Sequence, residues 1–471
     1  MNVPSSLPDE RSRPRDFRLW ILLSALAGAF LSHLVLARAF GPLSGAARDS
    51  WGVAFSLFGL LTLSGGLVVW AIWLARGMAP HWGIGVAIAA AGILMRLPYF
   101  GAGPMLEDDH YRYLLDGAMV ARGFNPYTLS PQNLLGELPP ALTGLVDAGR
   151  GVIEAINFPD LRSIYPGSAQ ALFAIAHWIA PWKLDGLRLV IFSAEAVTAI
   201  LIWHWLRSNG GSMLMGALYW CNPLMAFCLT GQAHIDAALA PPVLLALLAA
   251  SRNRALAAGI GLGLAVGVKL WPLLLAPLLA RALWPDRRRL FLFSLGLGSI
   301  TLLTCGPLLW ASLSAQAGLT AYAGGWSINN APFAWLSFLF FQGFGPGTGE
   351  LVLRAAIVGV AAGASLTIGL RSGKGSAGLV GRASILAGLL FYLSPAQFPW
   401  YAAWFLPLAA ASGSWVLIFG AVGLPIYFLF FPLAAAGLRD IHSYGLAALH
   451  LAPLFGAIAL HERLGAREVK R

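Results

Sequence analysis

Acidic and basic residues are rare in this chain, yet several gather between Glu107 and Asp116. The segment 105–131 reads MLEDDHYRYLLDGAMVARGFNPYTLSP and begins with three nearly adjacent carboxylates, Glu107, Asp108 and Asp109. A carboxylate within hydrogen-bond reach of a hydroxyl group can act as a general base. Asp108 or Asp109 could perform that step while the other orients the reacting groups or binds a metal ion, and Glu107 is a third candidate.

The spacing within this segment predicts a short helix. Asp109, Arg112, Tyr113 and Asp116 recur at intervals of three or four and would share one helix face. The following GFNPY is typical of a turn that ends a helix. We expect an amphipathic helix at the outer interface of the membrane that the chain spans. Arg112 on this helix is a phosphate-binding candidate, because a guanidinium group matches phosphate geometry. The alternative is a solvated loop in which the charges cost nothing.

Lys269 lies within the apolar run GVKLWPLLLAPLL. A lysine in such surroundings must extend to the membrane surface, pair with an acid or bind an anion. If a phosphate leaves during the reaction, a nearby cation would stabilise its developing charge. Lys269 is therefore a second phosphate-binding candidate.

His234 and Asp236 belong to the sequence GQAHID between two apolar segments. The structural interpretation places Asp236 in the first turn of the next helix, where a carboxylate is favoured. The functional interpretation is a polar cluster that faces the acidic loop, with His234 binding a substrate hydroxyl, a phosphate or a metal ion. Two acids and one histidine are too few to predict a zinc site.

Several aromatic and amide side chains are predicted on the same outer side. Tyr165 and Tyr401 are substrate-binding candidates, although tyrosine is also enriched at membrane interfaces for solvation reasons alone. Asn329 and Asn330 are better candidates, because amide side chains can bond to substrate hydroxyl groups. Arg96, in MRLPYF, is expected to be an interfacial anchor.

The composition identifies the class of protein that must position these residues. Of 471 residues, 58% are hydrophobic and 11% are charged, whereas a soluble domain is about 25% charged. Repeated apolar runs of about 18 residues predict membrane-spanning helices. The net charge of +11 comes from short loops that set orientation, so nucleic-acid binding is excluded as an interpretation. The three cysteines, Cys221, Cys228 and Cys305, imply no disulfide framework.

The sequence thus predicts an all-α polytopic membrane protein. We expect about 14 membrane segments, both termini in the cytoplasm and a long first external loop that carries interfacial helices. A disordered cytoplasmic tail over 1–18 and an extra transmembrane hairpin over 19–82 precede a catalytic transmembrane domain over 83–461 and a basic tail over 462–471. The expected spans are 19–38, 53–75, 83–100, 187–206, 213–230, 235–251, 290–309, 350–371, 378–393, 398–411, 414–435 and 444–461.

Two segments need the distribution of basic residues to place them. As one helix, 255–283 would be about 43 Å long, which exceeds a hydrocarbon core of about 30 Å. Pro272 offers a break, so we expect a tight hairpin with both ends cytoplasmic and Lys269 at its tip. The segment 165–182 is expected not to span, because that arrangement puts most basic residues on the cytoplasmic side and the acidic motif outside.

Several motifs together resemble the GT-C superfamily of membrane glycosyltransferases. The likeness is strongest to bacterial members near the polyprenyl-phosphate-mannose-dependent mannosyltransferases, and it covers residues 84 to 435. Gly167 departs from it, since that family closes its first external loop with tyrosine and two prolines. The matching motifs, in chain order, are EDDHYRYLLDG with GFNPY, IYPGSAQALFAIA (164–176), CNPLMAFCLTGQAHIDA (221–237), GVKLWPLLLAPLL (267–279), WSINNAPF (326–333) and LSPAQFPWYAAWFLPL (393–408).

The resemblance implies an inverting transferase that takes a sugar, mannose in the nearest relatives, from a polyprenyl-phosphate carrier. The acceptor would be a glycolipid or glycan outside the cytoplasm, and the site would face the periplasm or the cell exterior of a bacterial plasma membrane. By position, Asp108 or Asp109 takes the role of the family's acidic base. No cofactor is required by the resemblance, and the involvement of a divalent metal ion stays open.

Two other classes of function compete with this interpretation. A transporter, such as a flippase of lipid-linked sugars, would often show two matching broken segments and charged midplane sites. The sequence shows no such pair, and its charge lies at one outer loop. A noncatalytic binder of lipid-linked sugars would not need the Asp108–Asp109 pair.

Overall fold

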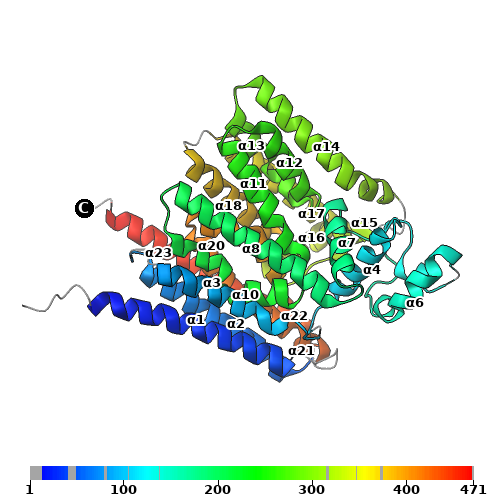
Figure 1. Ribbon diagram of the computed structural model, residues 1–471, viewed down its shortest axis with the longest axis horizontal. Coiled ribbons are helices and arrows are strands. Elements are labelled where there is room, and N and C mark those ends of the chain that lie inside the picture. The colour runs from blue at the N-terminus through cyan, green and yellow to red at the C-terminus, as the bar shows by residue number, and fades with distance from the viewer. Residues whose placement is uncertain are drawn as a thin grey trace, which may run out of the picture.

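A computed structural model describes residues 13–40, 49–78, 82–103, 105–136, 138–313, 318–345, 347–371 and 375–468 (Figure 1). Every regular element in these ranges is a helix, and the only β-pairing there is an isolated bridge between Ile328 and Ala396. The predicted all-α architecture is therefore confirmed. Continuous apolar segments favour helices because a helix satisfies all its own backbone hydrogen bonds in lipid.

The first three helices form a group along one side of the molecule (Figure 1). They are α1 (Arg13–Phe40), α2 (Trp51–Ala75) and α3 (Trp82–Arg96), and α1 contacts both of the others. The far end of the chain closes over α2, where Ala54 forms a small apolar cluster with Ile426, Leu429 and Leu433. The predicted N-terminal hairpin is thus packed against the rest of the bundle.

Arg96 is not the interfacial anchor that we expected. Its guanidinium is fully buried, pairs with Glu195 on α8 (Leu184–Ser208) and donates to the carbonyls of Gly92 and Trp220. A local sequence places Arg96 correctly near a helix end. It cannot show that a carboxylate about 100 positions away will lie opposite.

Helices of the segment that was predicted to be the first external loop gather at one end of the bundle, and α6 projects beyond the long helices (Figure 1). This group comprises α4 (Asp109–Ala121), α5 (Pro131–Leu134) and α6 (Pro140–Glu154), followed by α7 (Gly167–Ile179). The predicted helix over the acidic motif is confirmed. It packs closely on α7, where a side chain at Gly117 would lie 2.3 Å from the Phe173 carbonyl. At 13 residues, α7 is about 20 Å long, shorter than a hydrocarbon core.

The predicted span 213–230 is a broken helix. Its halves, Met213–Trp220 and Pro223–Gly231, meet at an angle of 43°. Pro223 begins the second half, and that half ends in a π-helical turn over Phe227–Gly231. A short 3₁₀ helix, Ile235–Leu239, then leads into α11 (Ala240–Ser251), so the GQAHID sequence lies between two irregular turns.

The hairpin predicted over 255–283 is confirmed. Its first arm is α12 (Ala255–Val266), and its second is Trp271–Leu283, which includes α13 (Ala276–Leu283). Arg289, near the start of α14 (Arg287–Ala311), donates to Asn253 Oδ1 at 2.6 Å, so both ends of the hairpin lie at the same end of the bundle. Lys269 lies in the turn at the opposite end.

The C-terminal part of the chain completes the bundle, and α16 (Ala331–Phe344) is the longest of the helices there that the sequence prediction missed. Ala331–Phe344 has 14 residues, too few for a search based on apolar runs of spanning length. The helices here are α15 (Gly318–Gly325), α16 (Ala331–Phe344), α17 (Thr348–Leu370), α18 (Gly375–Leu393), α19 (Leu406–Ser412), α20 (Trp415–Val422), α21 (Phe430–Ala435), α22 (Arg439–Tyr444) and α23 (Ala452–Glu468).

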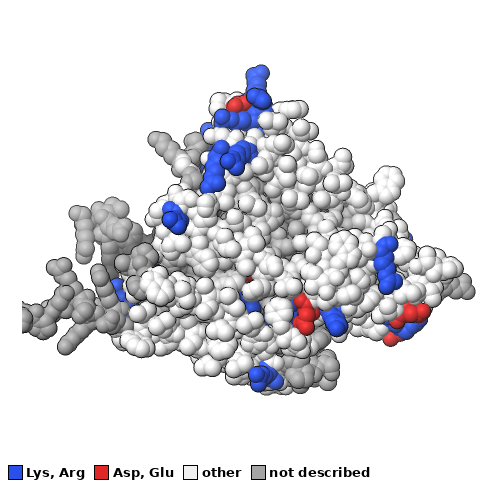
Figure 2. Space-filling view, in the orientation of Figure 1, with Lys and Arg blue, Asp and Glu red and all other residues white. Residues whose placement is uncertain are grey.

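Eight helices of the described chain are long and apolar enough to cross a membrane, or nine if the broken pair counts as one span. Five shorter apolar helices accompany them, and the total of about 14 segments stays a prediction. Arginines predicted to be cytoplasmic do share one end of the bundle: Arg281 donates to the Leu370 carbonyl, and Arg382 donates to the Arg371 carbonyl. Figure 2 shows basic side chains gathered at the tip where α14 begins, next to a broad uncharged surface.

Candidate active site

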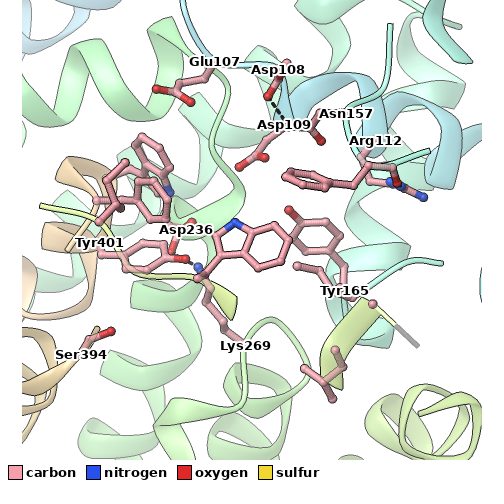
Figure 3. Close-up of a pocket in the computed structure, with 18 of the residues that line it drawn as sticks. Glu107, Asp108, Asp109, Arg112, Asn157, Tyr165, Asp236, Lys269, Ser394 and Tyr401 are labelled. Carbon is pink, nitrogen blue, oxygen red and sulfur yellow. Dashed lines mark hydrogen bonds and ion pairs between the residues drawn. The ribbon is translucent and has the colours of Figure 1, made fainter. Parts of the chain in front are cut away.

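A cavity of about 670 Å³ lies where the first external loop, the hairpin turn and the C-terminal segments meet. It receives side chains from the start of α4, from the 157–166 segment, from the Lys269 turn and from 394–431. These regions are far apart in sequence, and the acidic motif, Tyr165 and Tyr401 among them were predicted on the outer side. Figure 3 shows the acidic loop on one side of the cavity and Lys269 on the other.

The two aspartates of the acidic loop have different surroundings. Asp108 precedes the first residue of α4 and accepts a hydrogen bond of 2.7 Å from Asn157 Nδ2. Asp109 begins α4 and directs its carboxylate into the cavity, toward Asp236 (Figure 3). Its side chain is 36% exposed, toward the cavity that it lines, and its Oδ2 lies 3.7 Å from His234 Nδ1.

Burial and the neighbouring negative charge of Asp108 raise the pKa of Asp109 to about 7, although Lys269 acts in the opposite direction. A carboxylic acid with a pKa near neutrality is suited to proton transfer, because it is ionised often enough to accept a proton and basic enough to hold it. Asp109 therefore has the position and the proton affinity of a general base.

Lys269 is paired in this structure. Its Nζ lies 2.7 Å from Asp236 Oδ1 and 3.9 Å from the centre of the Tyr401 ring. Asp236 also accepts a hydrogen bond of 2.8 Å from Trp404 Nε1, which fixes the carboxylate. Because the lysine side chain is 25% exposed and lines the cavity, its ammonium group can still meet an anionic substrate there.

His234 is fully buried behind the cavity wall. Its ring stacks on Trp400 with centroids 3.8 Å apart, and neither ring nitrogen has a hydrogen-bond partner within the described chain. Burial and the positive charge of Lys269 lower the pKa of His234 well below its ordinary value, so the imidazole is neutral. It contacts Asp109 rather than the cavity. Ala233, at a φ of 60°, provides the turn before it.

Tyr165 and Arg112 line the same cavity at the acidic side. The Tyr165 hydroxyl lies 3.5 Å from the Tyr113 hydroxyl, and Arg112 donates to the Phe158 carbonyl at 3.3 Å. In Figure 3 the Arg112 guanidinium points away from Lys269, so the two predicted phosphate-binding cations do not converge.

Asn329 and Asn330 bind backbone instead of lining the cavity. Asn329 donates to the Gln397 carbonyl at 3.1 Å. Asn330 donates to the Ser394 carbonyl at 2.6 Å, and its Oδ1 accepts from Phe333 N at the start of α16. Both are buried, and their bonds join the 328–330 strand-like segment to the 394–397 turn. We therefore leave them out of the proposed site.

The sequence interpretation missed three residues that shape the site: Asn157, Trp404 and Tyr427. Tyr427 donates to Glu107 Oε1 at 2.9 Å and so anchors the first carboxylate of the motif to the C-terminal part of the chain. Asn157 lies in the loop after α6, and its only local signal is that it is polar. Trp404 lies within the PWYAAW motif, and its only local signal is that it is an aromatic residue of the kind found at membrane interfaces.

Residues 18–146 match the family model described as "Alpha-(1->6)-mannopyranosyltransferase, N-terminal domain", of the MptA_B family. This match supports a mannosyltransferase of the GT-C superfamily. The match covers 129 of the 471 residues, and together with the apolar helices it supports a membrane glycosyltransferase. No curated protein and no solved structure matched the chain.

The matched region of the chain contains both Asp108 and Asp109 and the whole of α4. It also takes in α1 and α2, which precede the motifs on which the sequence resemblance depended. In the described residues, no group of three or more His, Cys, Asp and Glu side chains is arranged to hold a metal ion.

Proposed function

We propose that the protein is an inverting glycosyltransferase that moves mannose from a polyprenyl-phosphate carrier to a glycolipid or glycan outside the cytoplasm. The observation that carries this proposal is the position of Asp109. Its carboxylate, with a pKa of about 7, enters the same cavity as the Lys269 ammonium group. A base and a cation in one cavity suit a displacement in which a hydroxyl attacks and a phosphate leaves.

The reaction proceeds at the anomeric carbon of the donor. The acceptor hydroxyl oxygen forms a bond to that carbon while the bond from carbon to phosphate oxygen breaks, and the phosphate leaves with the electron pair. Asp109 takes the hydroxyl proton, and Lys269 stabilises the charge on the phosphate. Asp236 and Trp404 position Lys269 through the 2.7 Å ion pair and the 2.8 Å hydrogen bond to Asp236.

Asp109 is the preferred base among the three carboxylates. Asp108 is oriented by Asn157, and Glu107 by Tyr427. Asp109 alone of the three has His234 at its side, which is neutral and therefore leaves its negative charge available. We assign Glu107 to shaping the site and Asp108 to raising the proton affinity of Asp109.

The distribution of basic residues supports an orientation in which the basic end of the bundle faces the cytoplasm. Short basic loops remain in the cytoplasm, and Arg281, Arg289 and Arg382 lie at the end opposite the Lys269 turn. The cavity then opens on the periplasmic or extracellular side of the plasma membrane. This placement lets a donor held in the lipid meet an acceptor from outside.

The test uses full-length protein in lipid with radiolabelled polyprenyl-phosphate mannose and membrane glycolipid extracts as acceptors. We expect transfer by the wild type and slower transfer by Asp108→Asn. Asp109→Asn should show no detectable transfer, although its thermal stability should equal or exceed that of the wild type. Equal transfer by Asp109→Asn and the wild type would reject the assigned base. Movement of the intact donor across sealed vesicles without transfer would instead support the flippase alternative.

A further inference from the structure

Phe158 has a backbone conformation that its residue type disfavours. Five non-glycine residues in the described chain have a positive φ, and Phe158, at 48°, is the one that lines the cavity. A bulky side chain with this φ is an outlier, and such strain is found at ligand-binding and active sites. Phe158 is also 50% exposed, so burial in the core does not account for its position.

Surrounding contacts hold this conformation. The Phe158 carbonyl accepts from Arg112 and from Leu161 N, and the next residue, Pro159, accepts from Gln132 N at 2.8 Å. Asn157, on the other side, is bonded to Asp108. Asn157 and the Phe158 carbonyl are thus bonded to Asp108 and Arg112 at the start of α4, while Pro159 is bonded to Gln132 of α5. These bonds fix the Phe158 backbone relative to the proposed base.

The Phe158 ring meets a second aromatic ring from a distant part of the chain. Its centroid lies 4.8 Å from that of Trp326, at an angle of 59°. Trp326 also lines the cavity, and its carbonyl accepts a hydrogen bond of 3.1 Å from Arg354. We call Phe158 and Trp326 the aromatic platform. It combines two fixed ring surfaces with a carboxylate–amide pair, Asp108 and Asn157, at its edge.

We propose that the aromatic platform binds the reacting sugar ring of the acceptor, so that the acceptor is a hexose-containing glycan or glycolipid. A pyranose ring has an apolar C–H face that packs on aromatic rings and hydroxyl groups at its edge that bond to carboxylates, amides and guanidinium groups. Asp108, Asn157 and Arg112 provide such groups next to Phe158.

The location separates this subsite from that of the donor phosphate. In Figure 3, Asp108, Asn157 and Arg112 lie on one side of Asp109, and Lys269 with Asp236 lies on the other. In an inverting displacement the acceptor hydroxyl attacks the anomeric carbon from the side opposite the leaving phosphate, and the base must lie within hydrogen-bond reach of that hydroxyl. The platform side therefore suits the acceptor, while Lys269 suits the departing phosphate. This inference rests on the proposed function, which it deepens.

The test measures sugar binding without requiring transfer. Saturation-transfer difference NMR would use full-length protein in lipid nanodiscs and methyl α-mannoside as the probe. We expect signal on the sugar ring protons with the wild type, with Asp109→Asn and with Phe158→Tyr. Phe158→Ala and Trp326→Ala should weaken binding by about tenfold or more, because each removes one ring surface. Trp178→Ala is the control, since Trp178 is 66% exposed on α7 and lies outside the cavity.

Phe158→Gly gives a second readout. Glycine adopts a positive φ without steric cost, so this variant should keep the thermal stability of the wild type or exceed it while losing mannoside binding. The proposal is overturned if the wild type does not bind mannoside, if Phe158→Ala and Trp326→Ala bind it as the wild type does, or if the cavity binds 1-octanol in place of the sugar. Because Asp109→Asn should slow transfer by about 10²–10⁴-fold but keep sugar binding, failure of the subsite and failure of the proposed reaction give different results.

Discussion

Two pairs of opposite charges lie inside this protein, and they differ in what surrounds them. The Arg96–Glu195 pair is fully enclosed: both side chains are 0% exposed. Backbone carbonyls, the hydroxyl of Thr230 and the Trp220 ring, 4.3 Å from the guanidinium carbon, surround it. The Lys269–Asp236 pair has one member, Lys269, that is 25% exposed to a cavity containing a third charge, Asp109.

This difference separates structural from functional charge in a membrane protein. Ionisable residues in an apolar bundle are expensive, and the usual inference is that they serve function. The Arg96–Glu195 pair instead joins α3 to α8 and leaves no room for a substrate. A charge is available for chemistry only where a cavity reaches it and where its partner leaves part of its surface open.

The largest effect that would sharpen this contrast is expected at Asp109. Replacing it by asparagine keeps the shape and removes the base, so the rate of transfer should fall about 10²–10⁴-fold. Above pH 7 the wild-type Asp109 is ionised in a site that favours its protonated form, which destabilises the folded protein. Asp109→Asn should therefore have a higher melting temperature than the wild type at pH 8. A lower melting temperature there would show that the carboxylate is structural.

The next effect is expected at the enclosed pair. Arg96→Met leaves Glu195 charged and buried without its partner, so the free energy of unfolding should fall by about 3–5 kcal/mol. Thermal unfolding in detergent would measure this loss. The matched double variant Arg96→Met/Glu195→Leu should recover most of it, because two apolar side chains replace two buried charges. If Arg96→Met abolished transfer at unchanged stability, the contrast between the two pairs would fail.

A smaller effect on rate is expected at Lys269. Lys269→Met should lower kcat by about 10²–10³-fold, since it removes one group that stabilises the departing phosphate. Lys269→Arg keeps the positive charge and should restore part of the rate. Kinetics at saturating donor would separate this loss of kcat from weaker binding. A change in stability alone, with normal kcat in the folded fraction, would place Lys269 with Arg96 as a structural charge.

The mildest test uses pH alone. With a pKa of about 7, Asp109 is largely ionised above that pH and largely protonated below it. The value of kcat/KM should therefore fall about tenfold for each pH unit below 7 and level off above it. Asp108→Asn removes a negative neighbour, so the same limb should shift to lower pH. A wild-type profile without a limb between pH 5 and 8 would argue against Asp109 as the base.

The sequence alone determined the class of protein and much of the local structure. Apolar runs predicted the helical membrane bundle, spacing predicted the helix that begins at Asp109, and length with Pro272 predicted the hairpin that carries Lys269. These results depend on hydropathy, periodicity and chain geometry, all of which act over neighbouring residues. The residue types of the acidic loop also predicted chemistry at one end of the bundle.

Only the tertiary structure decided which charges meet. Asp108 and Asp109 are equivalent in sequence, but Asn157 orients the first while the second faces the cavity. Arg96 forms an ion pair with Glu195, and Lys269 forms one with Asp236. The partners are too far apart in the sequence for a local pattern to predict either pair. The reason is physical: pairing, burial and the resulting pKa depend on packing between helices that are distant in the chain. The sequence supplied the ionisable groups, and the packing of the bundle determined which of them face the cavity.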